Sequence, residues 1–504
     1  MKKTNGKGTF NRREFIKGIG IGAGALTLGQ LSIVEAALLP KGAKTEKHNV
    51  VVIGTGLAGL CAALEARLAG ADVVILEKMQ SGKDGGNSKL AGGAIVMPPD
   101  RSKAGLDAYY EDFNKKSQGK GNAELSRIIA DNIFEAVDWI KSYGVEILPS
   151  LDTPPYRVKT ATVAPGQFMG MPPALAKLRE KYLKLGGKII FRTKAKQLIM
   201  NDRAKVVGVR ALGPDGLLVD YMADATVIAA GGYAGNKELL ETFVDPNADE
   251  MMVRGVPWAS GDGLMMAREA GATFVAMGGL SSLHVAAVSV ENSASGNPSR
   301  AIPFCIGINR DGMRYVDESL GYVAHGKAAL KQPGQRVALI FDEELKKKEG
   351  VRISWDTFTR LGIKILEADS LEGLAGKIGV PPEKLVQAVT DFNSAVKDGK
   401  ALTANPPKTA VAFKLTGPKF YAFYPLVPGI TLTFGGIRIN GKGQVLEADG
   451  TAIPGLFACG EAAGGVYYDD YFAGGSLANC LVMGRISGKE AAAAKTDLKK
   501  AGAK

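Results

Sequence analysis

The chain has 504 residues, which is long enough for roughly two to four domains. Of these residues 46% are hydrophobic and 23% are charged, a globular composition that excludes disordered and collagen-like chains. Its four cysteines form no C-x-x-C pair and it has only three histidines, so neither a c-type haem on these residues nor a metal site is expected. The net charge of +12 leaves nucleic acid, a membrane surface, an anionic substrate or an acidic partner open.

Residues 1–37 are predicted to be an export signal. Arg12 and Arg13 precede an apolar run from Gly18 to Leu28 that is too short to span about 30 Å of hydrocarbon. The arginine pair predicts twin-arginine export of a folded protein, and hence a periplasmic location. A chance arginine pair before an amphipathic helix is the alternative. The sequence holds no other long apolar run, so no integral membrane segment is expected.

The net positive charge is smaller when the predicted export signal is left out, and fewer kinds of partner then explain it. Residues 1–36 carry six basic and two acidic residues, so the remainder has a net charge of about +8. Its one basic run, Lys346 to Lys348, follows Asp342 in a helical pattern and indicates a solvated helix face. We therefore expect no nucleic-acid partner, and interpret the charge as a docking surface for an acidic electron donor.

A dinucleotide site is predicted directly after the first strand. A β-branched run from Asn49 to Ile53 indicates a buried parallel strand, and it is followed by Gly54, Gly56 and Gly59 in the G-x-G-x-x-G pattern. These glycines permit a tight turn, close approach to a pyrophosphate, and close helix packing. The helix that follows, to about residue 68, points its N-terminus at the anion.

A carboxylate lies at the expected distance. A second strand from Asp72 to Leu76 ends at Glu77, 23 residues after Gly54, where it can accept hydrogen bonds from ribose hydroxyls. Glycine-rich strand ends recur further along the chain and favour FAD over NAD, since backbone must lie against a large flat ligand: residues 85–93, 226–232, 453–461 and 474–476.

Together these residues resemble the flavoprotein family of soluble fumarate reductases, urocanate reductases and 3-ketosteroid dehydrogenases, over about residues 47–493. The most specific pieces are the 54–59 glycines with Glu77 and Lys78, the segments 85–88, 420–422 and 428–429, Gly435 with Gly436, and the segments 460–465 and 474–476. The chain looks closest to a periplasmic acrylate- or methacrylate-type reductase flavoprotein.

The resemblance implies an α/β fold, with a doubly wound, Rossmann-like FAD-binding domain over 47–279 and 433–495 and an inserted α+β clamp domain over 280–432. It implies non-covalent FAD, with Glu77 on the adenosine ribose, Glu461 on the ribityl or ribose hydroxyls, and a helix from Gly475 aimed at the flavin. The implied FAD contacts are Gly54, Gly56, Leu57, Ala58, Gly59, Glu77, Lys78, Asn87, Ser88, Gly92, Gly93, Ala230, Gly231, Gly232, Gly460, Glu461, Gly475, Ser476 and Leu477.

The substrate site departs from that of fumarate reductases. His284 matches one of two substrate histidines and Arg300 matches an arginine of the proton path, but the catalytic arginine position falls at Tyr322. The second histidine position falls within 430–433, and the last substrate arginine within 467–473, where neither residue type occurs. Two carboxylates would lack partners there, so one carboxylate or none is expected on the substrate.

Tyrosines supply neutral donors in place of the lost cations. The predicted catalytic residues are Tyr322, Arg300, His284 and Tyr421, and the predicted substrate contacts are Tyr468, Tyr471 and Thr431, with Tyr467 nearby. His325, three residues past Tyr322, is interpreted as structural or as a replacement donor, and each tyrosine could instead be a core aromatic with a satisfied hydroxyl.

The leading hypothesis is reduction of the C=C bond of an α,β-unsaturated monocarboxylate or enone. Flavin N5 would deliver hydride, Tyr322 assisted by Arg300 would supply the proton, and a separate c-type cytochrome would supply electrons. The alternatives are a ketosteroid or cyclic-ketone dehydrogenase, a fumarate- or urocanate-type reductase, and a flavin-containing electron carrier without its own substrate.

Overall fold

The structure, a computed structural model, describes residues 42, 44–153, 156–166, 169–248, 251–277, 282–288 and 296–494. The predicted export signal lies outside these residues. Within the described ranges, no helix combines the length and the apolar character that crossing a membrane requires.

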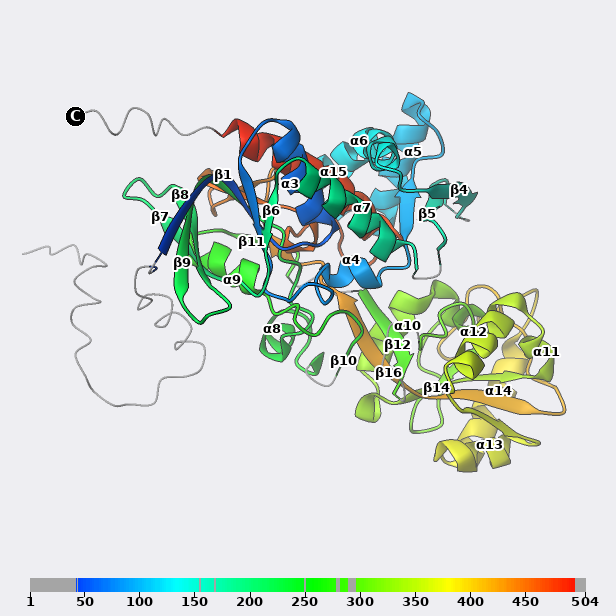
Figure 1. Ribbon diagram of the computed structural model, residues 1–504. Helices are drawn as coiled ribbons and strands as arrows, with labels where there is room; N and C mark the ends of the chain where they lie inside the picture. The colour runs from blue at the N-terminus through cyan, green and yellow to red at the C-terminus, as the bar shows by residue number, and fades with distance from the viewer. Residues whose placement is uncertain are drawn as a thin grey trace, which may run out of the picture. The chain divides into compact units, whose positions relative to one another are not determined.

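The first strand lies in the interior of an eight-stranded sheet (Figure 1). β1 (Lys44–Ile53) pairs in parallel with β2 on one side and β9 on the other, and its last four residues are buried. The β-branched run therefore forms the interior parallel strand that it predicts. The main path runs β18-β19-β9-β1-β2-β6; in addition β8 pairs with β9, and β7 pairs with β8. The strands are β2 (Val73–Leu76), β6 (Lys188–Ile190), β7 (Lys194–Met200), β8 (Val206–Leu212), β9 (Leu218–Ile228), β18 (Gln444–Leu446) and β19 (Ala452–Ala458).

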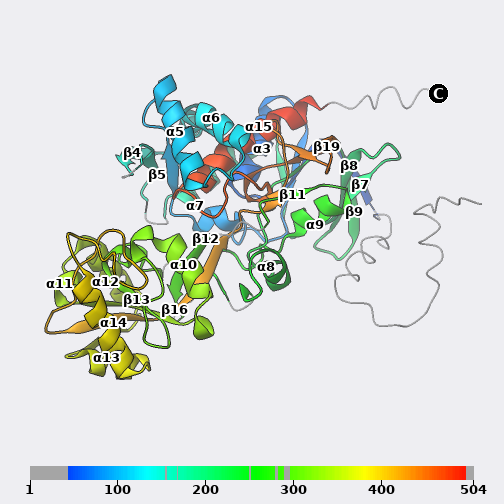
Figure 2. The same ribbon diagram turned by 180° about the vertical axis from the view of Figure 1, so that it is seen from behind.

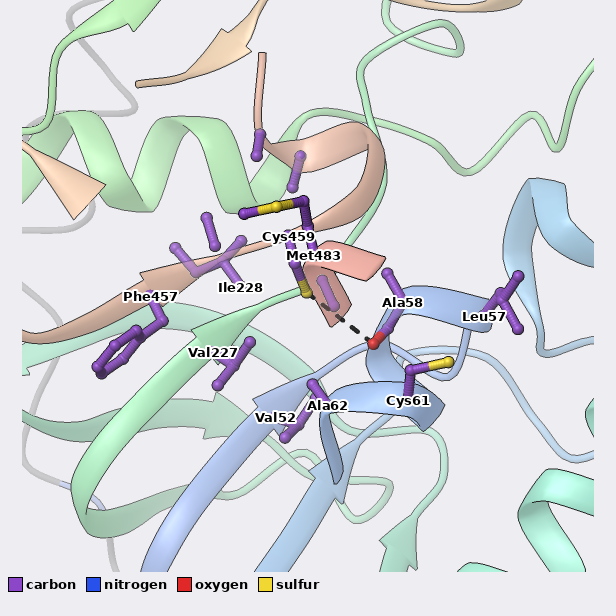
Figure 3. Close-up of a cluster of buried hydrophobic side chains, with 14 of the residues drawn as sticks. Val52, Leu57, Ala58, Cys61, Ala62, Val227, Ile228, Phe457, Cys459 and Met483 are labelled. Atoms are coloured by element: carbon purple, nitrogen blue, oxygen red, sulfur yellow. Dashed lines mark hydrogen bonds between the residues drawn. The ribbon is translucent and has the colours of Figure 1, made fainter. Parts of the chain in front are cut away.

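The C-terminal part of the chain returns to this sheet. β19 adds in parallel to β9, and α15 (Gly475–Ala493) then packs against α3 (Leu57–Leu68). The two helices approach closely at Gly488, which has no side chain. A Cβ there would lie 2.2 Å from the carbonyl oxygen of Ala62. Figure 3 shows apolar side chains of these two helices and of the strands β1, β9 and β19, with the Cys459 Sγ 3.9 Å from the Ala58 carbonyl oxygen.

Other helices and two small sheets complete the part of the chain around the first sheet. They are α4 (Gly86–Leu90), β3 (Ala94–Met97), α5 (Lys103–Lys116), α6 (Ala123–Ser142), β4 (Ile147–Asp152), β5 (Lys159–Val163), α7 (Met171–Lys184), α8 (Lys237–Phe243), α9 (Asp262–Glu269), β11 (Phe274–Val275) and β17 (Gly436–Ile437). β3, β5 and β4 form one sheet, and β11 pairs with β17 in another.

A second, six-stranded sheet is organised around β16 (Phe420–Leu432), which extends toward helices α11–α14 in both views (Figures 1 and 2). Its other strands are β10 (Met252–Val253), β12 (Ser282–Ala287), β13 (Ile306–Ile308), β14 (Val337–Asp342) and β15 (Ile365–Ala368). The helices in this part of the chain are α10 (Tyr322–Leu330), α11 (Glu343–Lys346), α12 (Glu349–Arg360), α13 (Leu371–Ile378) and α14 (Pro382–Ala395).

The buried apolar residues form two clusters, one around each of the two large sheets. The apolar cluster around the second sheet is drawn from residues between Val285 and Leu426, and the larger cluster is drawn almost wholly from the segments before and after it. β10 is a departure, because it joins the second sheet from the segment before residue 280. The predicted boundaries at 280 and 432 stay predictions.

A buried charged network lies next to α10 and connects segments around the second sheet. Glu318, fully buried, accepts hydrogen bonds from Arg314 at 2.8 Å and from the Gly307 N–H at 2.7 Å, with Lys408 Nζ 3.7 Å away. His325 on α10 is also fully buried, with its Nε2 2.9 Å from the Tyr315 hydroxyl. Burial, reinforced by the Lys408 charge, lowers the pKa of His325 from 6.5 to about 3.

His325 is expected to make the folded protein acid-sensitive. Its stabilising contribution is full above pH 6.5 and is lost as the pH falls toward 3, because the folded state must keep the imidazole neutral. Between pH 6.5 and 4.5 this loss amounts to roughly 2–3 kcal/mol. Urea unfolding of wild type and His325→Gln at both pH values measures it: the variant should lose less stability on acidification, and equal losses would contradict this role.

Candidate active site

The loop between β1 and α3 is shaped for a close-lying anion. Gly54 has φ +105°, and a Cβ there would lie 2.5 Å from the Ala229 carbonyl oxygen. By contrast, a Cβ at Gly56 would meet nothing nearer than the Ser88 Oγ at 3.5 Å. No side chain caps the N-terminus of α3 at Gly56, although the Leu57 N–H donates to Ser88 Oγ at 3.0 Å. The helix terminus is thus available for a phosphate.

Glu77 is held rigidly at the end of β2. Its carboxylate accepts hydrogen bonds from the N–H and hydroxyl of Thr55, at 3.1 and 2.5 Å, and from the Met79 N–H at 2.8 Å. It is 7% exposed, beside the glycine loop, as the sequence predicts for a ribose partner. Lys78 lies differently: its ammonium pairs with Asp262 at 2.7 Å and donates to Ser260.

Asn87 joins three segments through one carboxamide. Its Nδ2 donates to the Glu461 carboxylate at 3.0 Å and to the Thr431 carbonyl oxygen at 3.1 Å, and its Oδ1 accepts from the Val256 N–H at 2.8 Å. Glu461 also accepts from the Thr433 N–H at 3.0 Å. Burial raises the pKa of Glu461, while these donors oppose the shift.

The two glycines that follow β9 differ in the space around them. Gly231 has φ +76° and a Cβ there would find nothing within 4 Å, whereas a Cβ at Gly232 would lie 2.2 Å from Thr433 Oγ1. α15 begins at Gly475, as predicted, and next to it the Ser476 hydroxyl oxygen is buried without a hydrogen-bond partner among the described residues. An orphaned hydroxyl at a helix N-terminus fits a polar ligand edge.

Tyr322, the first residue of α10, lies beside two other candidate groups. Burial raises the pKa of its phenol, and Tyr471, through its charge and a hydrogen bond, raises it further, while Arg254 opposes the shift. The Tyr471 ring contacts the rings of Phe434 and Tyr467, with centroids 5.5 and 5.8 Å apart. Tyr322, Tyr467 and Tyr471 therefore gather as the sequence predicts.

Arg254 is the functional residue that sequence reasoning missed. It follows β10 and is 5% exposed, its N–H donates to the Ile430 carbonyl at 2.8 Å, and its guanidinium donates to Thr431 Oγ1 at 2.9 Å. Burial lowers its pKa to about 10, against the opposing effect of Tyr471 and Tyr322. No motif marks it, because only the pairing of β10 with β16 brings it to Thr431.

Residues 467–473 contact α10 and hold it next to this cluster. Lys327 on α10 donates to the Asp469 carbonyl, and its Nζ lies 3.5 Å from the Asp469 carboxylate. Lys116 on α5 pairs with Asp470 at 2.7 Å. Tyr468 points elsewhere, with the Lys120 ammonium 5.0 Å from its ring centroid.

One predicted catalytic residue lies away from the cluster. Tyr421 begins the far end of β16, about 30 Å along the strand from Thr431, where its hydroxyl donates to Glu343 and its ring stacks on Phe341. The Arg300 side chain is exposed, and its role stays a prediction from the resemblance. For His284 the structure describes the backbone, which pairs with Gly429 of β16.

The donor set indicates the class of ligand. No group of three or more His, Cys, Asp or Glu side chains gathers as a metal would need in the part of the chain that the structure describes. A helix terminus for pyrophosphate, a strand-end glutamate for ribose, and a second, part-buried carboxylate next to Gly232 fit FAD. The fold and the site are those of an FAD-binding flavoprotein.

Comparison with known proteins agrees. The family model described as "FAD binding domain" matches residues 49–477. The chain therefore belongs to this family, binds FAD, and is an FAD-dependent oxidoreductase.

Individual relatives extend over most of the chain. A probable fumarate reductase of Shewanella frigidimarina is 29% identical over 454 residues, covering 89% of this chain and 75% of that protein. The acrylate reductase flavoprotein subunit of Shewanella woodyi is 28% identical over 521 residues, covering 95% and 97%. The open conformation of a flavocytochrome c3 fumarate reductase has a TM-score of 0.75 at 28% identity, covering 92% and 81%.

Gly56→Ala should weaken FAD binding without disturbing the fold. The new methyl would meet Ser88 Oγ at an ordinary 3.5 Å, so only a cofactor lying on the loop would collide with it. We expect at least a tenfold loss of FAD affinity, by titration of the apoprotein, with its melting temperature unchanged. Gly376→Ala in α13, where a Cβ would meet nothing within 4 Å, is the control. Unchanged FAD affinity in Gly56→Ala would place the pyrophosphate elsewhere.

Proposed function

We propose that the protein reduces the C=C bond of an α,β-unsaturated monocarboxylate such as an acrylate or methacrylate, or of a similar enone. The observation that carries this proposal is the cluster of Tyr322, Tyr471, Arg254 and Thr431, which Asn87 joins by hydrogen bonds to the Glu461 carboxylate. The relatives named as acrylate and fumarate reductases support the same reaction class.

The residues expected to hold FAD are the 54–59 loop, Glu77, Asn87, Glu461 and Ser476. Bound FAD supplies hydride from its reduced N5. The protein then has to place the β-carbon of the substrate at that atom, polarise the double bond and provide a proton for the α-carbon.

Tyr322 is the proposed proton donor. Burial and Tyr471 raise its pKa, so the phenol is protonated at neutral pH and available to donate. Arg254 favours the phenolate that donation leaves behind, and the hydrogen bond with Tyr471 orients the phenol. The Lys327 contact with Asp469 keeps α10, and hence Tyr322, next to the 467–473 segment.

A monocarboxylate fits the charges better than a dicarboxylate does. Around Tyr322 the described groups include one buried arginine, several phenols and the carboxylate of Asp470. A second substrate carboxylate would add negative charge where burial already makes ionisation costly.

We propose that electrons come from a separate c-type cytochrome in the periplasm. The sequence has no C-x-x-C pair for haem attachment, and a similar solved structure is that of a flavocytochrome. The twin-arginine segment, outside the described residues, supports the location.

Turnover tests the reaction class directly. Holoprotein with reduced viologen should oxidise the dye on addition of acrylate or methacrylate, and more slowly or not at all with fumarate, urocanate and cinnamate. An enone steroid is the probe for the dehydrogenase alternative. Absence of reduction with every 2-enoate would exclude the proposed function, and a bound flavin with no responsive substrate would indicate an electron carrier.

Tyr322→Phe should lower kcat/KM for the preferred enoate by about 10²–10⁴-fold, since the ring is kept and the acidic proton removed. Its FAD content and the absorption spectrum of its bound flavin should match those of the wild-type protein. Tyr110→Phe, on α5, removes a phenol outside the cluster and should keep full activity. A Tyr322→Phe rate within threefold of wild type would rule out this tyrosine as the donor.

A further inference from the structure

We propose that Arg254, together with the hydroxyl of Thr431, binds the carboxylate of the substrate. The inference rests on the proposed function, since it assigns the anion site of the same reaction, and it makes this arginine the determinant of acid over neutral substrates.

The backbone positions Arg254 at a junction of three strands. Met252 of β10 and His284 of β12 both pair with Gly429 of β16, from opposite edges. Adjacent strands lie about 4.8 Å apart, so the segment of Arg254 and the backbone of His284 face each other across one strand, about 10 Å apart.

The side chain of Arg254 needs the glycine at 429. A Cβ at that position would lie 2.7 Å from the Cδ and 2.8 Å from the Cγ of Arg254. The chain thus gives up a side chain on β16 so that the arginine stem can cross it and reach the hydroxyl of Thr431. Such a fixed stem limits the rotamers of the guanidinium and prepares it for a ligand.

The surroundings select a planar anion. A guanidinium presents several N–H donors in one plane, which matches both oxygens of a carboxylate, and the Thr431 hydroxyl lies 2.9 Å from this guanidinium. The phenols of Tyr322 and Tyr471 lie close enough to act on the charge of Arg254. A carboxylate held there would place the carbon next to it, the α-carbon, toward the Tyr322 side of the cluster.

The same residues connect the anion site to the flavin side. The Thr431 carbonyl accepts from Asn87, which also donates to Glu461, and Val256, two residues after Arg254, donates to Asn87. A carboxylate on Arg254 is therefore fixed relative to the residues that hold FAD.

A binding measurement on the oxidised holoprotein tests this assignment without turnover. Calorimetry with propionate and with propionamide, which has the same shape without charge, should show tighter binding of the acid to wild type. Arg254→Met should weaken propionate binding at least 30-fold and remove the preference over the amide. Arg254→Lys, which keeps the charge but not the planar donors, should weaken it about tenfold.

Two further variants separate binding from folding. Thr431→Val keeps the shape of the side chain and should weaken propionate binding severalfold, while Arg352→Met, on an exposed face of α12, should leave it unchanged. FAD content and melting temperature identify any variant that is misfolded. If Arg254→Met is misfolded, propionate binding to Arg254→Lys decides whether the assignment holds. Wild-type propionate affinity in a folded Arg254→Met or Arg254→Lys protein would overturn the assignment. Loss of propionate binding in a protein that reduces no enoate would uphold the anion site and reject only the proposed reaction.

Discussion

The carboxamide of Asn87 is the interaction on which the arrangement of the site depends. Its amide donates to Glu461, on the side expected to hold the flavin, and to the end of β16, while its oxygen accepts from the segment that carries Arg254. Three segments far apart in the sequence are thereby held within one hydrogen-bond length of the same side chain. An aspartate would repel Glu461 and an alanine would leave the buried donor and acceptors unpaired.

The charged side chains differ between the two sides of Asn87, and this difference determines which kind of ligand each side suits. On one side, the buried Glu77 and the part-buried Glu461 have carboxylates engaged by N–H donors, which suits the hydroxyls of a dinucleotide. On the other side, a buried arginine stands among phenols. The guanidinium suits one substrate carboxylate, as proposed above, and the neutral phenols suit a proton transfer.

The elements on the side expected to hold FAD could be predicted from the sequence because they are built from local patterns, whereas their contacts with FAD stay predictions. The glycine loop, the strand-end Glu77 and the helix at Gly475 each follow from spacing along a few residues. The catalytic side depends on which strands pair. Tyr421 was expected there because it lies in a characteristic segment, yet β16 is long enough to carry it about 30 Å away, into the second core. Arg254 was missed for the converse reason, since a two-residue strand gives no periodic signal.

A crystal structure of the oxidised, FAD-loaded protein with bound propionate tests most directly whether cofactor and acid meet at this junction. We expect the carboxylate on Arg254 and Thr431, the second carbon within about 3.5 Å of the Tyr322 hydroxyl, and the flavin ring on the opposite side of the acid, near Asn87 and Glu461. A carboxylate bound away from Arg254, with Tyr322 out of reach of the acid, would contradict this arrangement.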